Sequence, residues 1–441
     1  MIAIKPFAGV MFDNPKPAGG DRNKVYRMAE TSAPPNREPA QRATLKRSLT
    51  LPLLTLYGLG VTIGAGIYVL VGAAAAKAGM YAPVSFIIAA GAVAFTGLSY
   101  SELGTRFPVS AGEAAYVREG FRSPALSLIV GLMVAASGII SSAAVAIGAA
   151  AYIHQFVPLP PDLLAALVIA LVGLVAAWGI FESVSIAALF TLVEVGGLCF
   201  VVYYGLSANP DALQNAADLI PPFEAGAWAG IFSASLLAFF AFVGFEDIAN
   251  VAEEAVRPAR NMPLAIILTL IIATAFYVAV VAVTVLVVPL DELSVSAAPL
   301  ALVFGPAGPL TATIFRIIAI IATVNGILIQ IIMASRVIYG LADQGSLPGI
   351  LGRVSPLTRT PLVATAAVVA IVLALALLVP IAELAETTSR VVLTVFAMVN
   401  LALLRLKWTA AASDREVFTV PAWIPVAGLL ASALLLLADL F

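Results

Sequence analysis

Long apolar stretches dominate the pattern of this chain, and the polar residues gather between them. An apolar helix of about 18 residues or more, rising about 1.5 Å per residue, is long enough to cross the roughly 30 Å hydrocarbon core of a bilayer. The sequence contains eleven such stretches, at about 51–76, 83–106, 124–153, 162–180, 184–206, 228–253, 262–289, 310–342, 361–379, 382–406 and 423–440. The pattern therefore predicts an all-α polytopic membrane protein with eleven transmembrane helices.

The first 47 residues differ from the rest of the chain. They are rich in proline, carry nine Lys or Arg residues and contain no long apolar stretch. Such a composition predicts a disordered tail, and the tail lacks the apolar region of a cleaved signal peptide. Residues 48–410 are predicted to form a ten-helix core, and residues 411–441 to add one C-terminal helix.

The basic residues predict an orientation in the membrane. Of the 23 Lys and Arg residues, 19 lie in the tail or in loops on the same side as the tail, whereas Lys77 alone lies in a loop on the other side. Arg316, Arg336 and Arg390 fall within predicted helices. Loops rich in Lys and Arg stay in the cytoplasm, so the N-terminus is predicted to be cytoplasmic. The plasma membrane is the expected location of this multi-pass protein.

Composition narrows the possible functions. The chain is 61% hydrophobic and 11% charged, and its mean hydropathy is +1.05. Its formal net charge is −2, without a basic patch for nucleic acid. One His and one Cys offer neither a metal-ligand spacing nor a nucleophile with its base, and no GxxxxGK[ST] loop indicates an ATP-driven pump. We therefore predict no enzyme activity, no metal and no cofactor.

Glycines interrupt two predicted helices, at Gly64-Ala65-Gly66 in the first and at Gly244 in the sixth. Within a bilayer, a helix breaks only where the freed backbone groups line a cavity or a site. Paired breaks in corresponding positions of two halves are typical of secondary transporters. Five helices in each half, over 48–207 and 227–408, place the second half in an inverted orientation. Packing glycines in ordinary membrane helices are the alternative.

The two breaks expose different backbone groups: the first exposes amide donors and the second exposes carbonyl acceptors. The first amides after Gly66 have no partner within their helix, and together with the positive end of the helix dipole they suit a carboxylate. Carbonyl groups freed just before Gly244 suit an ammonium group. Glu246 follows that break, and acidic residues at membrane depth usually face a cavity or a partner. Alternatively, Glu246 lies at the wet interface.

A third candidate is Glu194, near the middle of the fifth helix. A carboxyl buried at this depth is a natural proton carrier. The alternative is a neutral glutamic acid that holds a broken helix through hydrogen bonds. Thr323 and Asn325 in the eighth helix are candidate polar partners for the first break, and we group them with Glu194 as candidates for proton or ion coupling.

Four segments resemble the amino acid–polyamine–organocation permeases. GVTIGAGIYVLVG is similar to the first helix of that family, and SYSELGTRFPVSAGEAAYVREGF to its second helix and the following loop. FFAFVGFEDIANVAEEAVRPARNMPLAI resembles the sixth helix and its loop, and ASRVIYGLADQGSLPGIL with RTP at 359–361 resembles the end of the eighth. The resemblance covers about residues 45–410, and the motifs of helices 1 and 6 are the most specific.

The resemblance implies a LeuT-like fold of two inverted five-helix repeats that moves amino acids by alternating access. It places the substrate carboxylate at the first break and the substrate amine at the second, with Phe240 as the gating aromatic. An arginine/agmatine antiporter of this family carries a glutamate where Glu246 stands. By this match the substrate-binding candidates are Ile63, Gly64, Ala65, Gly66, Ile67, Phe240, Ala241, Val243, Gly244 and Glu246.

This chain departs from the family in two respects. Some proton-coupled relatives carry a lysine on helix 5 near the position of Glu194, so their coupling mechanism does not transfer. Members commonly have twelve helices, whereas this sequence predicts eleven. We predict an amino acid transporter, with proton symport favoured over exchange; a non-cycling amino acid sensor is the remaining alternative. The sequence determines neither the particular amino acid nor the oligomeric state.

Overall fold

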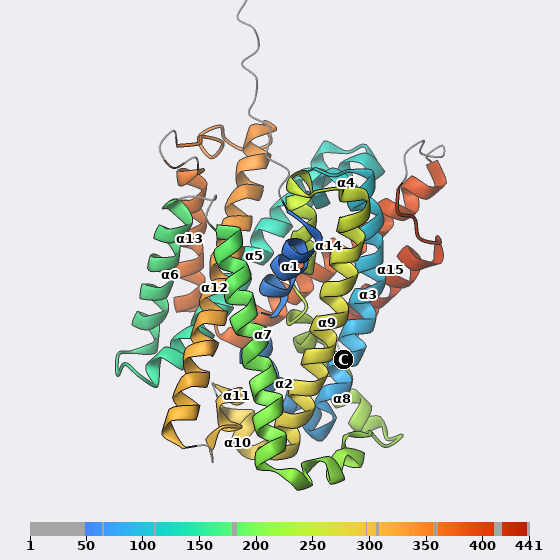
Figure 1. Ribbon diagram of the computed structural model, residues 1–441. Helices are drawn as coiled ribbons and strands as arrows, with labels where there is room; N and C mark the ends of the chain where they lie inside the picture. The colour runs from blue at the N-terminus through green and yellow to red at the C-terminus, as the bar shows by residue number, and fades with distance from the viewer. Residues whose placement is uncertain are drawn as a thin grey trace, which may run out of the picture. The chain divides into compact units, whose positions relative to one another are not determined.

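The structure is a computed structural model that describes residues 49–63, 66–109, 112–178, 183–296, 298–305, 308–355, 358, 360–409 and 417–438 (Figure 1). Residues 1–48 lie outside the described residues, and so does the tail predicted at 1–47. Gly64 and Ala65, two of the predicted substrate-binding residues, also lie outside them.

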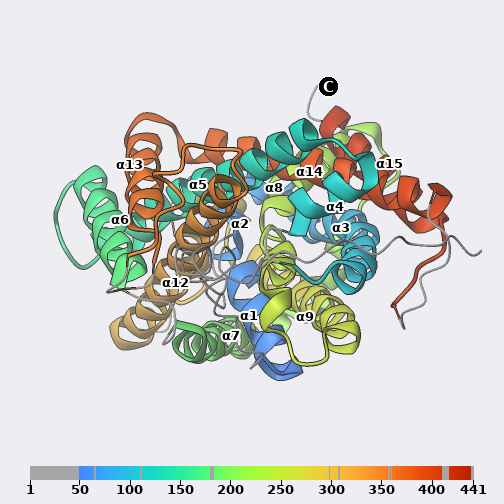
Figure 2. The same ribbon diagram turned by 90° about the horizontal axis from the view of Figure 1, so that it is seen from above.

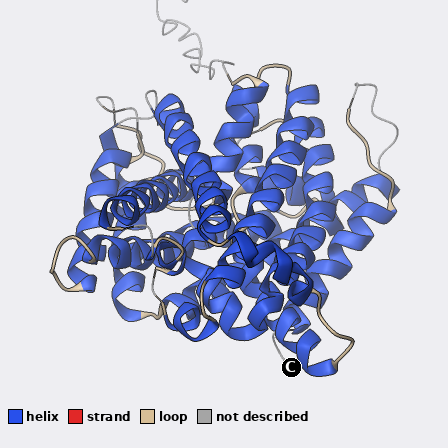
Figure 3. Cartoon of the chain, turned by 60° about the horizontal axis from the view of Figure 1, so that its bottom comes forward, coloured by secondary structure: helices blue, strands red, loops and turns tan. Residues whose placement is uncertain are grey.

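The described chain consists of helices and connecting loops (Figure 3). Within the described ranges the only extended pairing is an isolated parallel bridge between Leu49 and Ala255. The α-helices are α1 (Leu51–Ile63), α2 (Gly66–Ala78), α3 (Ala82–Arg106), α4 (Gly112–Phe121), α5 (Pro124–His154), α6 (Pro161–Trp178), α7 (Ser183–Ala208), α8 (Ala225–Phe240), α9 (Pro258–Val287), α10 (Leu290–Val295), α11 (Pro299–Leu302), α12 (Pro309–Asp343), α13 (Leu362–Leu378), α14 (Ile381–Thr409) and α15 (Trp423–Ala438). The 3-10 helices are η1 (Gly79–Tyr81), η2 (Pro210–Leu219) and η3 (Phe245–Glu254).

The helices follow the predicted apolar stretches, and the all-α polytopic membrane fold is confirmed. Within the part of the chain that the structure describes, eight helical stretches are long and apolar enough to cross a membrane, and α1, α13 and α15 are shorter apolar helices. The first predicted stretch is divided between α1 and α2, and the sixth between α8 and η3. Proline stands in the first turn of α5, α6 and α9, where its missing amide hydrogen leaves no intrahelical bond unmade.

The two divided stretches lie at the centre of the helix assembly. Viewed along the helices, α1 and α2 are surrounded by α7, α9, α12 and α5, whereas α6 with α13 and α15 lie at opposite edges (Figure 2). α1 packs against α7, α9 and η3, and α2 packs against α8. At the edge, α6 exposes Leu167, Leu171 and Leu174. Exposed leucines in a row on one helix suit contact with lipid.

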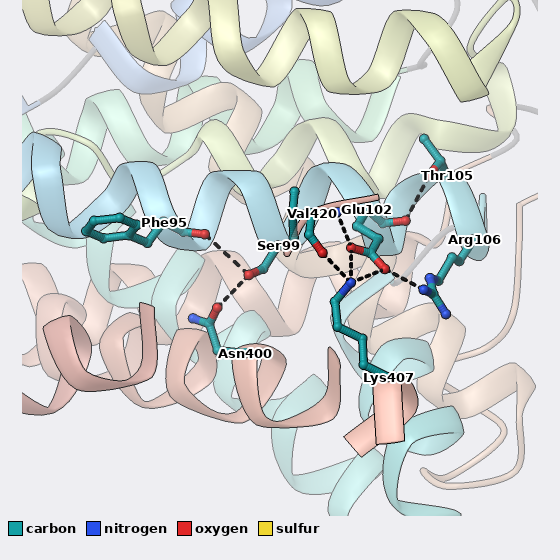
Figure 4. A network of polar contacts seen from close by, with 8 residues as sticks. All are labelled: Phe95, Ser99, Glu102, Thr105, Arg106, Asn400, Lys407 and Val420. Carbon is teal, nitrogen blue, oxygen red and sulfur yellow. Dashed lines mark hydrogen bonds and ion pairs between the residues drawn. The ribbon is translucent and has the colours of Figure 1, made fainter. Parts of the chain in front are cut away.

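α14 is tied to neighbouring helices at both of its ends. Near α4, the carboxylate of Glu102 on α3 is fully buried and contacts Lys407 Nζ at 2.7 Å, Arg106 and the amide of Val420 at 2.7 Å (Figure 4). We call these four residues the Glu102 clasp. At the opposite end, Glu386 of α14 pairs with Lys77 of α2 and with Arg390, each at 3.3 Å. Those three side chains are partly exposed.

Candidate functional site

The two helix breaks contact each other directly. A Cβ atom on Gly66 would lie 2.3 Å from the Cα atom of Ala241, so only glycine allows the start of α2 to approach the end of α8 this closely. Gly244 has a φ of +120°, and a Cβ atom there would lie 2.4 Å from Val61. The two glycines therefore bring the predicted carboxylate-binding and ammonium-binding groups together in one place.

Tyr277 of α9 joins the two breaks. Its hydroxyl lies 2.6 Å from the carbonyl oxygen of Thr62 and 2.7 Å from that of Ala241. A tyrosine hydroxyl has one hydrogen, so it fully satisfies only one of these two acceptors at a time. No sequence pattern singles out this residue, because Tyr277 lies in an apolar helix like many other buried aromatic residues.

The backbone groups at the breaks match a zwitterion in charge. The amides of Gly66 and Ile67 open α2 and have no carbonyl partner within that helix. On the other side, the Phe240 carbonyl accepts from the Val243 amide at 3.1 Å, and the Ala241 carbonyl accepts from Tyr277. A carbonyl oxygen has two lone pairs, so both can accept a further hydrogen bond. Ile63 and Ile67 are fully buried, and Val243 is almost so.

Phe240 lines an apolar wall beside the breaks. It is buried and belongs to a cluster with Leu70, Ile139, Leu237 and Ile327. Three buried polar atoms near the helices of this wall have no hydrogen-bond partner, namely Thr62 Oγ1, Ser142 Oγ and Gln330 Oε1. Gln330 of α12 faces α5, because its Oε1 would lie 3.1 Å from a Cβ atom on Gly138. Buried polar atoms without a protein partner are available for a hydrogen bond to a ligand or to water.

Glu194 is brought to Asn325 but not to Thr323. The Glu194 side chain is fully buried, its Oε1 accepts a hydrogen bond from Asn325 Nδ2 at 2.8 Å, and its Oε2 has no partner. The Thr323 hydroxyl instead donates within its own helix, to Ala319 at 2.9 Å or Ile320 at 3.0 Å, as threonines in helices commonly do.

Tyr68 links Glu194 to the helix that follows the first break, and Tyr152 of α5 bonds in turn to Tyr68. The Tyr68 hydroxyl donates to the backbone carbonyl of Glu194 at 3.0 Å, and the Tyr152 hydroxyl donates to the carbonyl of Tyr68 at 2.7 Å. Tyr68 lies two residues after Gly66 in α2. The side chain of Glu194 thus bonds to Asn325 of α12, while its backbone carbonyl bonds to Tyr68 of α2. A titratable group therefore connects α12 with α2, the helix that begins at the first break.

Glu246 is buried in the structure. Its side chain is 6% exposed, and its Oε2 accepts the amide hydrogen of Gly244 at 2.9 Å. It lines a small cavity with Asp247 and with Glu113 of α4. The sequence reasoning missed Glu113, although an acidic residue in the first turn of a short helix next to a membrane helix was a usable signal.

Comparison with known proteins gives a family match over most of the chain. A family model described as amino acid permease matches residues 49–441. The branched-chain amino acid permease BcaP of Bacillus subtilis (strain 168) is 30% identical over 387 residues, which cover 82% of this chain and 82% of that protein. The methylthioribose transporter of the same organism is 26% identical over 388 residues, which cover 82% of each chain.

Longer relatives occur in plants. The vacuolar cationic amino acid transporter 4 of Arabidopsis thaliana is 30% identical over 384 residues, which cover 82% of this chain. The matched region is 64% of that protein, so this chain spans a little less than two thirds of its length.

Proposed function

We propose that this chain, which belongs to the amino acid permease family, moves amino acids across the plasma membrane by alternating access and proton symport. The protein is a multi-pass membrane transporter, like its relatives in the permease family, and it is not an enzyme. What we propose beyond this is the symport mechanism, the proton as the coupling ion and the residues that form the site. The observation that carries it is a fully buried carboxyl, Glu194, held by Asn325 beside two helix breaks in mutual contact.

The proposed orientation follows the basic loops. With the N-terminus in the cytoplasm, the end of the molecule that carries α4 faces the cytoplasm, and the end that carries α10 and α11 faces outward (Figure 1). Residues 48–207 and 227–408 are the proposed inverted repeats of a LeuT-like fold. The broken stretches then open the two repeats, and their contact lies at the interface between them.

The proposed substrate pose uses both breaks. The carboxylate binds the amides of Gly66 and Ile67, where the start of α2 contributes positive charge. The ammonium group binds the carbonyl of Ala241 and those of neighbouring residues at the end of α8, and its N–H groups supply the donor that a single Tyr277 hydroxyl cannot give to both breaks. Phe240 closes over the bound substrate from the apolar wall.

The apolar wall favours a neutral, apolar side chain. Leu70, Ile139, Leu237 and Ile327 belong to the same buried apolar cluster as Phe240, and Glu246, the carboxyl nearest in sequence, lines a cavity with Glu113 of α4. A cationic side chain buried in this wall would lack a counter-charge, and burying an unpaired charge is costly. We therefore propose branched-chain or similar amino acids as substrates, which agrees with the name of the bacterial relative BcaP.

Proton coupling is proposed to run through Glu194. Its Oε2 has no hydrogen-bond partner, and among the described residues no Lys, Arg or His forms an ion pair with it. A carboxylate buried without a counter-charge binds a proton readily. Proton binding at Glu194 would act on α2 through Tyr68, whose hydroxyl bonds to the Glu194 backbone.

Uptake into proteoliposomes tests the proposal. Empty vesicles with an acidic exterior should accumulate labelled leucine, and an uncoupler should abolish the accumulation. The Glu194→Gln variant should keep leucine exchange between preloaded vesicles and medium but lose proton-driven accumulation. Uptake that requires preloading even with native Glu194 would indicate an exchanger, and leucine binding without uptake or exchange would indicate a sensor.

A further inference from the structure

Three carboxyl groups meet in a cavity near the end that carries α4. Glu113 comes from α4, and Glu246 and Asp247 come from the start of η3. Val134 and Ser137 of α5 complete the wall together with residues of α14. The cavity has room for about one water molecule. This cavity is separate from the Glu194–Asn325 pair, which lies on α7 and α12.

The polar atoms around this cavity are incompletely paired. Glu113 and Asp247 are each 1% exposed, and neither Glu113 Oε1 nor Asp247 Oδ2 has a hydrogen-bond partner. The fully buried Tyr100 hydroxyl lies beside the Glu113 carboxyl, and it too has no hydrogen-bond partner of acceptable geometry. Among the described residues, no Lys, Arg or His pairs with any of the three carboxyls.

Three ionised carboxylates cannot share this cavity without a cation. Each buried charge loses its hydration, and like charges at short range repel one another. The closed arrangement therefore requires bound protons, and the carboxyls titrate as a coupled group rather than singly. A bound proton also supplies a donor for the unpaired oxygens.

We propose that Glu113, Glu246 and Asp247 form a shared proton-binding site that holds α4 closed against η3, and that loss of its protons opens this end of the molecule. The inference rests on the proposed function only for the statement that this end faces the cytoplasm. A transporter in this orientation releases protons to the cytoplasm as it opens there.

The site is joined to the second helix break through the backbone. The Gly244 amide donates to Glu246 Oε2 at 2.9 Å, and the Asp247 amide donates to the Gly244 carbonyl at 3.0 Å. The Gly244 amide donates to the Glu246 carboxyl, so a proton gained or lost by Glu246 changes the strength of this hydrogen bond at the break. Ala241, whose carbonyl belongs to the proposed ammonium site, lies three residues before Gly244 in the same break.

The direction of the pH effect follows from Glu113, which lies on α4 outside the candidate spans. Burial raises the pKa of Glu113 from 4.5 to about 7, although nearby Tyr100 and Asn250 favour the ionised form. When α4 moves away and the carboxyl is hydrated, its pKa returns toward the ordinary value. Between about 4.5 and about 7, the closed form thus holds a proton that the open form lacks, so rising pH favours opening in this window.

The other groups that face Glu113 do not reverse this direction. Tyr100 of α3 and Tyr116 of α4 approach it, and burial, aided by the Glu113 charge, raises the pKa of Tyr116 so that its hydroxyl stays neutral. The residues of α5 and α14 that line the cavity carry no titratable group, as they are Val134, Ser137, Val392, Val395 and Phe396. Arg118 and Glu119 on α4 are exposed to solvent.

Cysteine accessibility at the seam between α4 and η3 tests the inference. Ala249 of η3 is fully buried, and its Cβ lies 3.3 Å from the position that a Cβ atom on Gly112 would take. In a Cys199→Ser background, Ala249→Cys provides a single thiol at this seam. The rate at which a maleimide labels this thiol is measured in substrate-free vesicles from pH 5 to pH 8. Each rate is divided by the labelling rate of the unfolded protein at the same pH, which removes the effect of pH on the thiol itself.

We expect the normalised rate to rise about tenfold per pH unit at most and to level off above about pH 7. Adding Glu113→Gln or Asp247→Asn should weaken this rise or remove it, because an amide cannot release a proton. Glu119→Gln, which changes an exposed carboxyl of the same helix, should keep the full profile.

Three outcomes would overturn the inference. These are a normalised rate that does not depend on pH, an unchanged profile in both variants, and a rate that responds to replacing sodium with choline rather than to pH. Because labelling needs no transported substrate, failure of the amino acid uptake assay leaves this test intact. Conversely, proton-driven uptake with a flat labelling profile would reject the shared site alone.

Discussion

The hydroxyl of Tyr277 lies 2.6 Å from the carbonyl oxygen of Thr62, 215 residues away in the sequence. The same hydroxyl lies 2.7 Å from the Ala241 carbonyl, so one donor serves the final turns of both α1 and α8. The ligand-free site is therefore short of donors at the position where the proposed substrate brings an ammonium group. This shortage gives a direct prediction.

The Tyr277→Phe variant should lower the thermal stability of the ligand-free protein and increase the stabilisation that substrate gives. Leaving a buried carbonyl without its donor costs roughly 1–3 kcal/mol, and a bound ammonium group would restore part of that loss. Thermal unfolding in detergent, with and without leucine, measures both effects. Tyr152→Phe is the matched control, because its hydroxyl bonds to the Tyr68 carbonyl and not to a break. An equal leucine-induced shift in both variants would contradict the prediction.

The Gly66→Ala variant should abolish leucine uptake and binding. Its added methyl group would lie 2.3 Å from the Ala241 Cα atom, and because that atom belongs to the backbone, the two breaks must move apart. Scintillation proximity binding and uptake measure the loss. Gly91→Ala in α3 is the control, since a Cβ atom there has no other atom within 4 Å. Normal leucine binding by Gly66→Ala would show that the contact between the breaks is not needed for the site.

The Glu113→Gln variant should stabilise the protein at pH 8 and leave its stability nearly unchanged at pH 5. The pKa of Glu113 is higher in the folded protein, about 7, than its ordinary value of 4.5, so its contribution to stability is full below 4.5 and is lost as pH rises to about 7. The difference in pKa corresponds to about 3 kcal/mol as an upper bound. Thermal unfolding across this range measures it, with Glu119→Gln as the control. A stabilisation that does not change with pH would argue for a packing effect.

Breaking the Glu102 clasp should cost far more stability than breaking the pair at the other end of α14. Lys407→Met leaves the fully buried Glu102 with Arg106 as its remaining charged partner, and removing one member of a buried pair typically costs about 3–5 kcal/mol. Lys77→Met removes a partly exposed pair, which is worth roughly 0–1 kcal/mol. Thermal unfolding at low and high salt compares them, and only the Lys77 effect should shrink with salt. Equal losses would show that the clasp is not a buried ion pair in solution.

The sequence predicted the helices well because a bilayer imposes a minimum apolar length. It also predicted where two helices divide, since Gly66 and Gly244 occupy positions that no larger residue fits. The partners of the polar groups were harder to predict. Thr323 and Asn325 lie two residues apart in one helix, yet only Asn325 reaches Glu194, because residues at this spacing point in different directions.

Glu113 shows why the grouping of the three carboxyls could not be predicted, even though the residue itself carried a signal. It belongs to a short helix between two long ones, and no apolar periodicity sets the position of α4 relative to η3. Only the three-dimensional packing brings its carboxyl to Glu246 and Asp247. Tyr277 escaped prediction for a related reason, since its role depends on two carbonyl groups that are distant in sequence.

The unequal attachments of α14 have a mechanical consequence. At Lys407 the helix is fixed by a buried charge that also holds the segment leading into α15, whereas at Glu386 it is held by a weak pair open to water. A rigid helix that is held firmly at one end and weakly at the other tilts about the firmly held end. Small rotations about Lys407 would thus become the largest displacements at Glu386, so the pair with Lys77 at the end of α2 would separate first.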